Sequence, residues 1–362
     1  MRTVQTATVA SGILAAAILA AGPAAAGPKW QIDTQSWMQA SVLIQPHYSF
    51  VDGAADEDDF YLRRGRLILQ GQAMEGVKFF LETDNDNAGR SGYSGVSTDI
   101  QDAWLDVELG QSGHGVMAGL ILLPFSLETR ASAASIMGID YNAETIKMVN
   151  DFVWRDYGAE LHGTFAEKRL VYHVGVFDGY ETETATLEKN PDADLRMTGH
   201  VALNVVGRGT DGGWFYSQNQ LGKASYLTVG AGYDTQDKAT VGLVDGEAAP
   251  DTVKDSEAWV ADFQSCYVTC DRAALLLNGA WYDWDNAKFV GNTAFLEGGL
   301  LVDKKAMVTA KYSLQDPDAG TKVEDTTVGL HYFMKGQNVR GGVEYRTGDS
   351  PDWWLVGLQF LL

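Results

Sequence analysis

The last nine residues of the chain predict a strand with one strongly apolar face. That face carries Trp354, Val356, Leu358, Phe360 and Leu362. A soluble protein rarely ends on such a face, whereas a transmembrane β-barrel closes on a C-terminal strand whose outer surface is apolar. The end of the chain therefore points to an outer membrane.

The other end of the chain has the pattern of a secretory signal peptide. Arg2 precedes an apolar stretch at 10–21, and three alanines at 24–26 form a small-residue cleavage site. A membrane anchor is the alternative, but the stretch is shorter than a span and no stop-transfer pattern follows it. We expect 1–26 to be a signal peptide and 27–362 to be a barrel, exported through the periplasm to the bacterial outer membrane.

Period-two alternation inside the chain supports the same fold. Residues 38–50 alternate apolar and polar side chains, and residues 64–73 do the same. A three-residue turn at 74–76 leads into a further alternating run, which predicts a hairpin. After the signal peptide no segment has about 18 consecutive apolar residues, so spanning helices are excluded. Forty glycines, fifteen tyrosines and ten tryptophans fit strands with aromatic girdles.

The alternation predicts sixteen antiparallel strands and thus an all-β transmembrane barrel. Their approximate ranges are 37–50, 60–73, 77–83, 99–109, 115–124, 156–166, 169–178, 194–205, 224–234, 256–265, 272–283, 291–301, 305–314, 324–334, 338–347 and 353–362. An even number of strands places both termini on the periplasmic side. Sixteen strands enclose an aqueous channel, because barrel diameter grows with strand number.

Connections between these strands alternate in length, as outer-membrane barrels require. The short ones are 74–76, 167–168, 302–304 and 335–337. The long ones, expected outside the cell, are 84–98, 125–155, 179–193 and 235–255. The Gly-rich segment 206–223 breaks the rule, since it is long on the periplasmic side. It is either an extended turn or a missed hairpin that would make eighteen strands.

The longest loop, 125–155, follows the fifth strand, where a loop folded into the lumen can narrow the pore. Its charged residues Arg130, Asp140, Glu144 and Lys147 could then line a constriction. The alternative is an exposed surface loop.

The polar faces of the predicted strands carry charges of both signs. Basic candidates for lining the pore are Arg64, Arg66, Lys78, Arg196, His200, Lys311, His331, Arg340 and Arg346. Acidic candidates on the same faces are Glu82, Asp102, Asp106 and Glu344. Arginine donors can replace part of the hydration shell of an anion. Inward arginines and carboxylates on neighbouring strands also form ion pairs that only stiffen the wall, and both interpretations stay open.

Several segments are similar to a known family of channels. They are the arginine-rich 60–72, then 78–84, 124–128 (Pro-Phe-Ser-Leu-Glu), 172–179 and 326–333. In these segments the chain resembles the phosphate- and pyrophosphate-selective porins of the O/P type. The resemblance implies a trimeric sixteen-stranded channel whose lumen passes anions along basic side chains. The chain departs from the family in the few cations of its 125–155 loop and in its net charge of −21.

A negative field concentrates cations at a pore mouth at low ionic strength. We therefore predict a passive porin for small hydrophilic solutes and inorganic ions, embedded in outer-membrane lipid, with a slight preference for cations. A phosphate- or anion-selective uptake channel with an arginine-lined site is one alternative, and a non-conducting structural barrel or adhesin is another. None of the six histidines lies in a nucleophile motif, so we expect no enzyme activity, no cofactor and no nucleic-acid partner.

The only cysteines, Cys266 and Cys270, are separated by three residues in a predicted turn. In the oxidising periplasm we expect them to form a disulfide. A metal site is disfavoured, because no neighbouring His or third Cys completes a ligand set. A strand running through both cysteines would exclude the disulfide, since positions i and i+4 of a strand lie too far apart to bridge.

Overall fold

The structure is a computed structural model that describes residues 27–52, 57–93, 97–110, 112–145, 147, 154–180, 188–244 and 247–362. The predicted signal peptide at 1–26 lies outside the described residues. Within the described ranges, no helix is long and apolar enough to cross a membrane.

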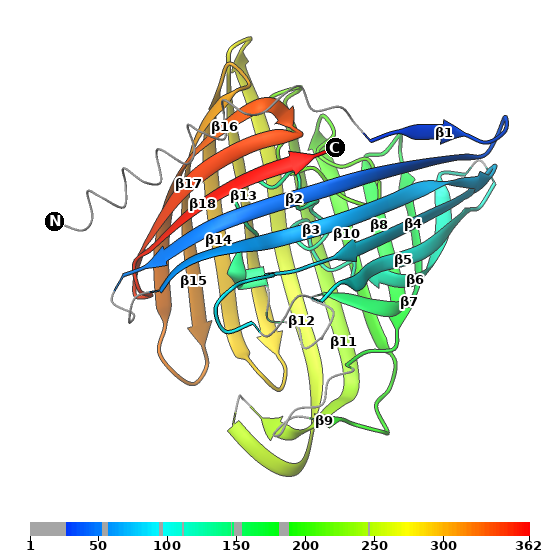
Figure 1. The fold of residues 1–362 in the computed structure, drawn as a ribbon. Coiled ribbons are helices and arrows are strands. Elements are labelled where there is room, and N and C mark those ends of the chain that lie inside the picture. The colour runs from blue at the N-terminus through cyan, green and yellow to red at the C-terminus, as the bar shows by residue number, and fades with distance from the viewer. Residues whose placement is uncertain are drawn as a thin grey trace.

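Sixteen antiparallel strands of the described chain close into a barrel (Figure 1). In chain order they are β2 (Trp37–Val51), β3 (Glu57–Met74), β4 (Val77–Asp84), β5 (Asp99–Glu108), β6 (His114–Leu122), β7 (Arg155–Phe165), β8 (Leu170–Phe177), β10 (Arg196–Val206), β11 (Tyr226–Val244), β12 (Glu247–Cys270), β13 (Ala273–Asp285), β14 (Val290–Val302), β15 (Ala306–Pro317), β16 (Val323–Gln337), β17 (Val339–Gly348) and β18 (Trp353–Leu361). Each strand pairs with the next, and β18 pairs with β2 to close the ring. The predicted sixteen-stranded barrel is confirmed.

Three short elements lie outside this ring of strands. β1 (Lys29–Gln31) pairs with the start of β2, and β9 (Glu188–Lys189) pairs with β11. A 3₁₀ turn, η1 (Ala143–Thr145), lies in the connection between β6 and β7. The segment expected to be either an extended turn or a hairpin, 206–223, forms no further hairpin, so the eighteen-stranded alternative is wrong.

The prediction of a long loop at 235–255 is also wrong. Both β11 and β12 continue through it as a paired hairpin, with Thr235 opposite Glu257 and Val241 opposite Val253. This hairpin extends beyond the other strands at the bottom of Figure 1, where β9 adds to it. Its Gly, Pro and Asp residues resemble loop composition, which is why the pattern favoured a loop.

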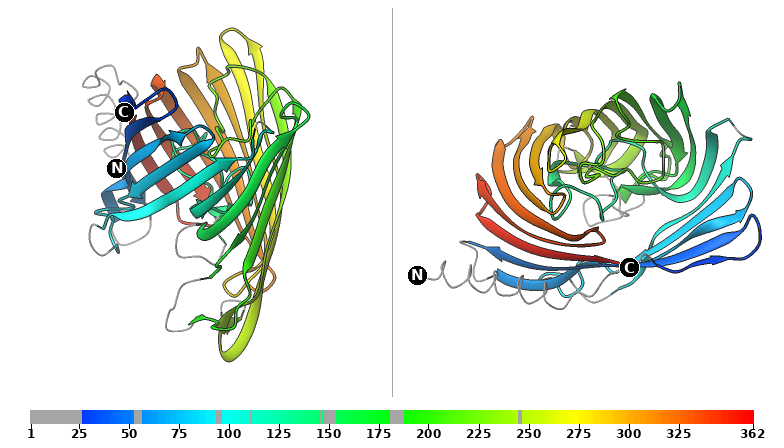
Figure 2. Two further views of the ribbon diagram at one scale, coloured as in Figure 1. Left: turned by 90° about the vertical axis from the view of Figure 1, so that its right-hand side faces the viewer. Right: turned by 90° about the horizontal axis from the view of Figure 1, so that it is seen from above.

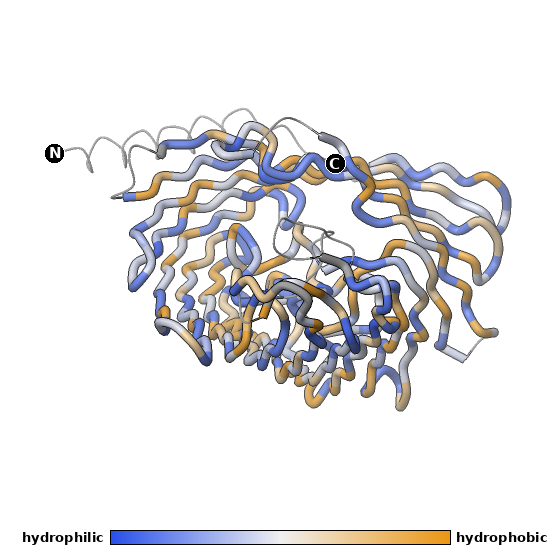
Figure 3. Tube along the Cα trace, turned by 90° about the horizontal axis from the view of Figure 1, so that it is seen from below, coloured by the Kyte–Doolittle hydropathy of each residue, from blue (hydrophilic) through white to orange (hydrophobic). Residues whose placement is uncertain are grey.

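The strands have an apolar outer face and a polar inner face, because lipid contacts one side and the lumen the other. On β10, Val201 and Leu203 are exposed, whereas Thr198, His200 and Asn204 between and beside them are buried. Hydrophobic and hydrophilic residues alternate along the strands in the same way in Figure 3. The interior of this protein is therefore where its charged groups gather.

Aromatic side chains pair across adjacent strands on the outside of the barrel. Tyr233 and Trp259 are register partners with ring centroids 4.1 Å apart, and Tyr345 and Trp354 are partners at 4.6 Å. Amphipathic aromatic rings of this kind stabilise a barrel at the boundary between lipid and water.

The barrel has two unlike ends. At one, which we call the turn end, β3–β4 and β12–β13 are joined by very short connections. At the other, the loop end, connections are mostly longer. Two segments fold into the barrel, as the view from above in Figure 2 shows. They are the constriction loop, described at 123–145 and 147, and the inserted turn, 207–225, between β10 and β11.

The expected disulfide is wrong for this structure. Cys266 is buried, Cys270 is exposed, and both thiols are free. β12 runs through both residues, with Cys266 opposite Leu276 and Cys270 opposite Ala273 on β13. Four residues of strand span about 13 Å, whereas disulfide-bonded Cα atoms lie within about 7 Å.

Candidate pore constriction

The constriction loop runs along the inner wall instead of over the surface. Its residues Leu123, Phe125 and Met137 are completely buried. Gly232 on β11 permits this, because a Cβ there would collide with the carbonyl oxygen of Phe125. The loop therefore occupies part of the lumen, as Figure 2 shows for the chain inside the ring.

Side chains of the wall hold the backbone of the loop by hydrogen bonds. The backbone N–H of Leu127 donates to Asp262 on β12 at 2.7 Å. The Arg340 guanidinium on β17 donates to the carbonyl of Ile136 at 2.8 Å. The Gln359 amide on β18 donates to the carbonyl of Ala134 at 2.9 Å. These bonds satisfy loop groups that would otherwise be buried without a partner, and they fix the loop across a wide arc of the wall.

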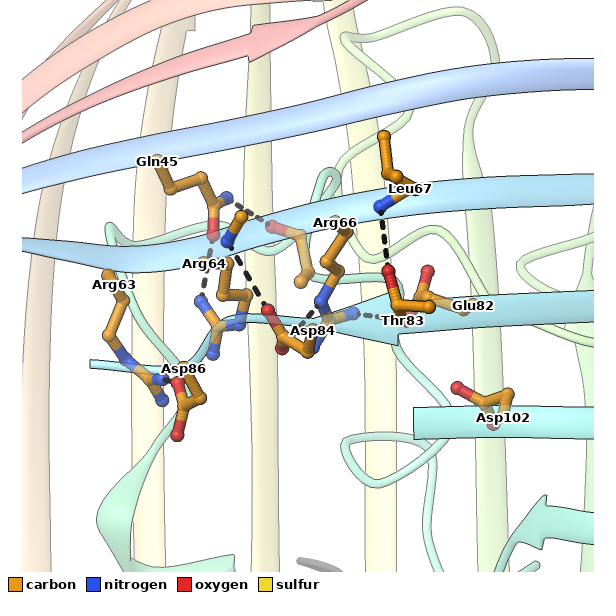
Figure 4. Close-up of polar contacts among 12 residues, drawn as sticks. Gln45, Arg63, Arg64, Arg66, Leu67, Glu82, Thr83, Asp84, Asp86 and Asp102 are labelled. Atoms are coloured by element: carbon orange, nitrogen blue, oxygen red, sulfur yellow. Dashed lines mark hydrogen bonds and ion pairs between the residues drawn. The ribbon is translucent and has the colours of Figure 1, made fainter. Parts of the chain in front are cut away.

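The arginines of β3 form the basic part of the constriction (Figure 4). Arg66 points between two carboxylates, with Nε 2.8 Å from Asp84 and Nη1 2.7 Å from Glu82. Arg64 donates from Nη1 to the side-chain oxygen of Gln45 at 2.9 Å. Both arginines are buried. Side chains of the barrel wall therefore already accept hydrogen bonds from both guanidinium groups.

Asp140 of the constriction loop completes this arrangement. Its carboxylate lies 2.8 Å from Nη2 of Arg64 and 2.5 Å from Nε of Arg63, which also pairs with Asp86. Burial opposes ionisation of Asp140, but the two guanidinium groups outweigh it and hold the pKa of that carboxyl well below its usual range. The loop thus neutralises the arginines by direct contact.

Arg63 was not predicted, because strand parity places it on the outer face. It is the extra residue of a β-bulge, since Arg64 pairs with Gln45 and Leu62 pairs with Pro46. A bulge re-aims side chains, and here it lets consecutive arginines share Asp140. Pro46, which cannot donate to a ladder, is the one sequence signal for this irregularity.

Arginines on the following strands are also matched with carboxylates. Arg155 on β7 donates to Asp102 on β5 at 2.9 Å. Arg196 on β10 contacts both oxygens of Asp234 on β11, each at 2.8 Å. The Arg196–Asp234 pair is bidentate and uses the planar donor fork of the guanidinium. The Arg196 pair joins the neighbouring strands β10 and β11, and the Arg155 pair spans β6 to join β5 and β7, so both stiffen the wall.

Arg130, in the constriction loop, is also paired with a carboxylate. It is fully buried, and its two terminal nitrogens lie 2.9 and 3.1 Å from the Glu160 carboxylate on β7. His173 on β8 contacts the same carboxylate at 2.5 Å. The guanidinium also lies over the ring of Trp214 on the inserted turn, 4.8 Å from its centroid. Arg130 therefore anchors the loop.

A second part of the constriction is acidic. Glu128 and Glu144 of the loop and Glu297 and Glu344 of the wall are all buried, and all four interact electrostatically with Lys311 on β15. One oxygen of Glu344 accepts from the backbone N–H of Ile139 at 2.7 Å. Burial raises the pKa of Glu128, against the opposing effects of Asn142, Lys311 and Gln218. This cluster, which we call the acidic sector, has an excess of carboxylates.

The predicted pore-lining residues fall into two groups. Twelve are buried inside the barrel: Arg64, Arg66, Glu82, Asp102, Asp106, Arg130, Glu144, Arg196, His200, His331, Arg340 and Glu344. Five are half-buried: Lys78, Asp140, Lys147, Lys311 and Arg346. The first group lies mostly in the network described above, whereas Lys78 pairs with Glu108 near the turn end and Arg346 lies over Trp353 near the loop end.

Comparison with known proteins agrees with this architecture. The family model for phosphate-selective porin O and P matches residues 41–252. OmpF of Salmonella typhi, solved with daunomycin, is 12% identical with a TM-score of 0.63, covering 92% of this chain and 100% of that one. The outer-membrane channel DcaP of Acinetobacter baumannii is 14% identical at 0.60, covering 93% and 100%. OmpT of Vibrio cholerae, in a trimer form, is 11% identical at 0.59, covering 91% and 100%. No curated protein matches the chain.

Proposed function

Because the chain belongs to the phosphate-selective porin O and P family and is an outer-membrane porin, we propose that it passes small hydrophilic solutes and ions with a slight preference for cations. One observation carries the proposal: carboxylates outnumber cationic side chains at the constriction. The cationic ones are Arg63, Arg64, Arg66, Arg130, Lys147, Arg155, Lys311 and Arg340. The carboxylates are Glu82, Asp84, Asp86, Asp102, Glu128, Asp140, Glu144, Glu160, Glu297 and Glu344.

The arginines attract anions weakly because their charges are already compensated. A phosphate entering beside Arg66 would compete with Glu82 and Asp84, both within 2.8 Å of the guanidinium. Breaking a buried pair by removing one partner costs about 3–5 kcal/mol. The acidic sector, in contrast, sets four glutamates against Lys311 and Arg340, and it has a negative potential when three or more of them are ionised. A permeating cation is favoured by that potential.

The reversal potential of the purified protein in a planar bilayer with a tenfold KCl gradient tests this proposal. We expect a modest potential of the sign that cation preference produces. The preference should weaken at high salt, because the Debye length falls from about 10 Å at 0.1 M to about 3 Å at 1 M. A strong anion preference would contradict it.

A phosphate-selective channel is the second candidate. The clustering of Arg63, Arg64 and Arg66 on one strand favours it, since adjacent guanidinium groups are suited to a phosphate. It requires the anion to displace Asp140 from the arginines it contacts. Conductance that saturates or is blocked at low phosphate would identify this candidate.

We also propose the assembly and orientation of the protein. A homotrimer is supported by the likeness to OmpT of Vibrio cholerae, which was solved in a trimer form. With the turn end in the periplasm, the long loops face outward as in other outer-membrane barrels. Residues 1–26 would be removed on export, so the mature protein should begin at Gly27. Cross-linking in native membranes and N-terminal sequencing of the purified protein test these points.

A further inference from the structure

The inserted turn is unusual because the turn end otherwise carries short connections. β12 and β13, for example, are separated by only Asp271 and Arg272. The inserted turn instead reaches the constriction loop inside the barrel. The backbone N–H of Tyr216 donates to the carbonyl of Arg130 at 2.7 Å, and that of Ser132 donates to the carbonyl of Tyr216 at 2.9 Å. Tyr216 and Ala131 form a parallel bridge.

Side chains extend this contact in both directions. Gln218 of the inserted turn donates to the Glu128 carboxylate and accepts from the backbone N–H of Met137 at 3.2 Å. The backbone N–H of Asn219 donates to the carbonyl of Ser135 at 2.9 Å. Tyr216, Gln218 and Asn219 are all buried. The two segments are therefore packed together as one body within the lumen.

The start of the inserted turn is fixed to the wall by Asn204 of β10. Its amide nitrogen donates to the carbonyls of Lys168 and Thr210, each at 2.7 Å, and its oxygen accepts from the Thr228 hydroxyl at 2.6 Å. Gly209 follows at a position where a Cβ would collide with Thr228 and Tyr226. A buried and fully bonded anchor of this kind indicates that the inward course of the turn is part of the native structure.

The inserted turn also bounds the space that is left at the turn end. A cavity of 480 Å³ lies there, lined by the turn at Asp211, Gly212 and Trp214 and by wall residues from β4 to β8 such as Lys78 and Asp106. Trp214 packs against Trp104 of β5 with ring centroids 4.5 Å apart. Its indole therefore spans from the turn to the wall.

We propose that the inserted turn is a second constriction element, which limits conductance and solute size from the turn end and holds the constriction loop in place. The inference rests on the proposed channel function. The turn forms hydrogen bonds with the backbone of Arg130, Ser132 and Ser135. Removing the turn therefore both breaks these hydrogen bonds of the constriction loop and widens the lumen. The loop alone does not set the pore size.

Replacing residues 208–224 by Asn-Gly, a two-residue hairpin turn, tests the proposal in planar bilayers. We expect single-channel conductance to rise about two-fold or more, because conductance through a narrow pore grows with its open cross-section. Swelling of proteoliposomes should become faster for a trisaccharide by a larger factor than for a monosaccharide. Conductance and size selectivity equal to those of the wild type would overturn the inference.

Point variants keep the test decisive if the shortened chain does not fold. Trp214→Ala should raise conductance by roughly a tenth to a third, since the indole borders the cavity, and Trp214→Phe should restore most of the wild-type value. Lys223→Ala, an exposed residue of the same turn, is the matched control and should leave conductance unchanged. Equal effects of Trp214→Ala and Lys223→Ala would overturn the inference, whereas a wild-type protein that forms no channel would overturn the proposed function.

Discussion

Replacing Asp140 by asparagine removes one charge at the point where the constriction loop meets the arginines of β3. The carboxylate contacts Arg63 and Arg64, and its side chain is 26% exposed, so it faces both the arginines and water. Asparagine keeps the shape and a hydrogen-bonding oxygen. The variant therefore changes the field in the pore more than the packing of the loop.

The size of the effect follows from Coulomb's law. A monovalent ion passing about 4 Å from a unit charge in water gains or loses about 1 kcal/mol, which corresponds to about a five-fold change in its local concentration. The loss of Asp140 lowers the attraction for K⁺ and the repulsion of Cl⁻ together. The two effects multiply to about 25-fold without screening. Screening at 0.1 M salt reduces this, so we expect the ratio of K⁺ to Cl⁻ permeability to fall about ten-fold there, and less at 1 M.

The assay is the reversal potential in a KCl gradient, with two controls. Asp140→Glu keeps the charge and should keep most of the selectivity. Asp303→Asn removes an equal charge from an exposed side chain 2.5 Å from Arg272, away from the cavity and the constriction, and should have a much smaller effect. If Asp140→Asn shifts the reversal potential no more than Asp303→Asn does, the ion path does not pass Asp140 and the reasoning fails.

The effect should persist in mild acid. Because the folded-state pKa of Asp140 is held well below its ordinary value of 3.8, the stabilisation and the charge it supplies are fully present above about pH 4. Both are lost only as the pH falls through the lowered pKa. The difference between wild type and Asp140→Asn should therefore be the same at pH 3.8, the ordinary pKa of the group, as at pH 7. A difference that falls by about half at pH 3.8 would show an ordinary carboxyl that is not bound by the arginines.

Three further predictions concern the wall. Arg66→Ala leaves Asp84 without its cation and Glu82 with only Arg155, 4.0 Å away. We expect a shift toward cations in the reversal potential and about 3–5 kcal/mol of lost stability, measured by denaturant unfolding. An unchanged potential would place this cluster away from the ion path. Lys311→Gln should raise cation preference, because it removes the one cation that interacts with all four glutamates and leaves only Arg340 near two of them; a shift toward anions would contradict the acidic sector. A maleimide should label exposed Cys270 in the folded protein and Cys266 only after unfolding. If neither cysteine reacts until a reductant is added, the two form the disulfide that the sequence predicted.

Strand alternation predicts the barrel because each strand separates lipid from the lumen by the same period-two rule. The rule fails where backbone pairing is irregular. Arg63 lies in a bulge opposite Pro46, so parity assigns it to the wrong face. The hairpin at 235–255 was interpreted as a loop because its composition is polar and turn-like, while its ladder depends on pairing that local propensity does not show.

The constriction is harder to predict, because its contacts join residues far apart in the chain. Asp140 was a candidate from its charge, but its partners lie on a strand 76 or more residues earlier. The inward course of the inserted turn depends on bonds between Tyr216 and Arg130 and between Gln218 and Glu128. The unusual length of the inserted turn on the side with short connections indicated an irregular segment. It did not indicate that the segment folds into the lumen.

Single-channel conductance in KCl with increasing inorganic phosphate tests the central claim, that carboxylates already occupy the arginine donors of the constriction. The account predicts that conductance increases with KCl concentration without saturation and is not blocked by millimolar phosphate. Block at low phosphate, abolished by Arg64→Ala or Arg66→Ala, would contradict it and establish an anion site among these arginines.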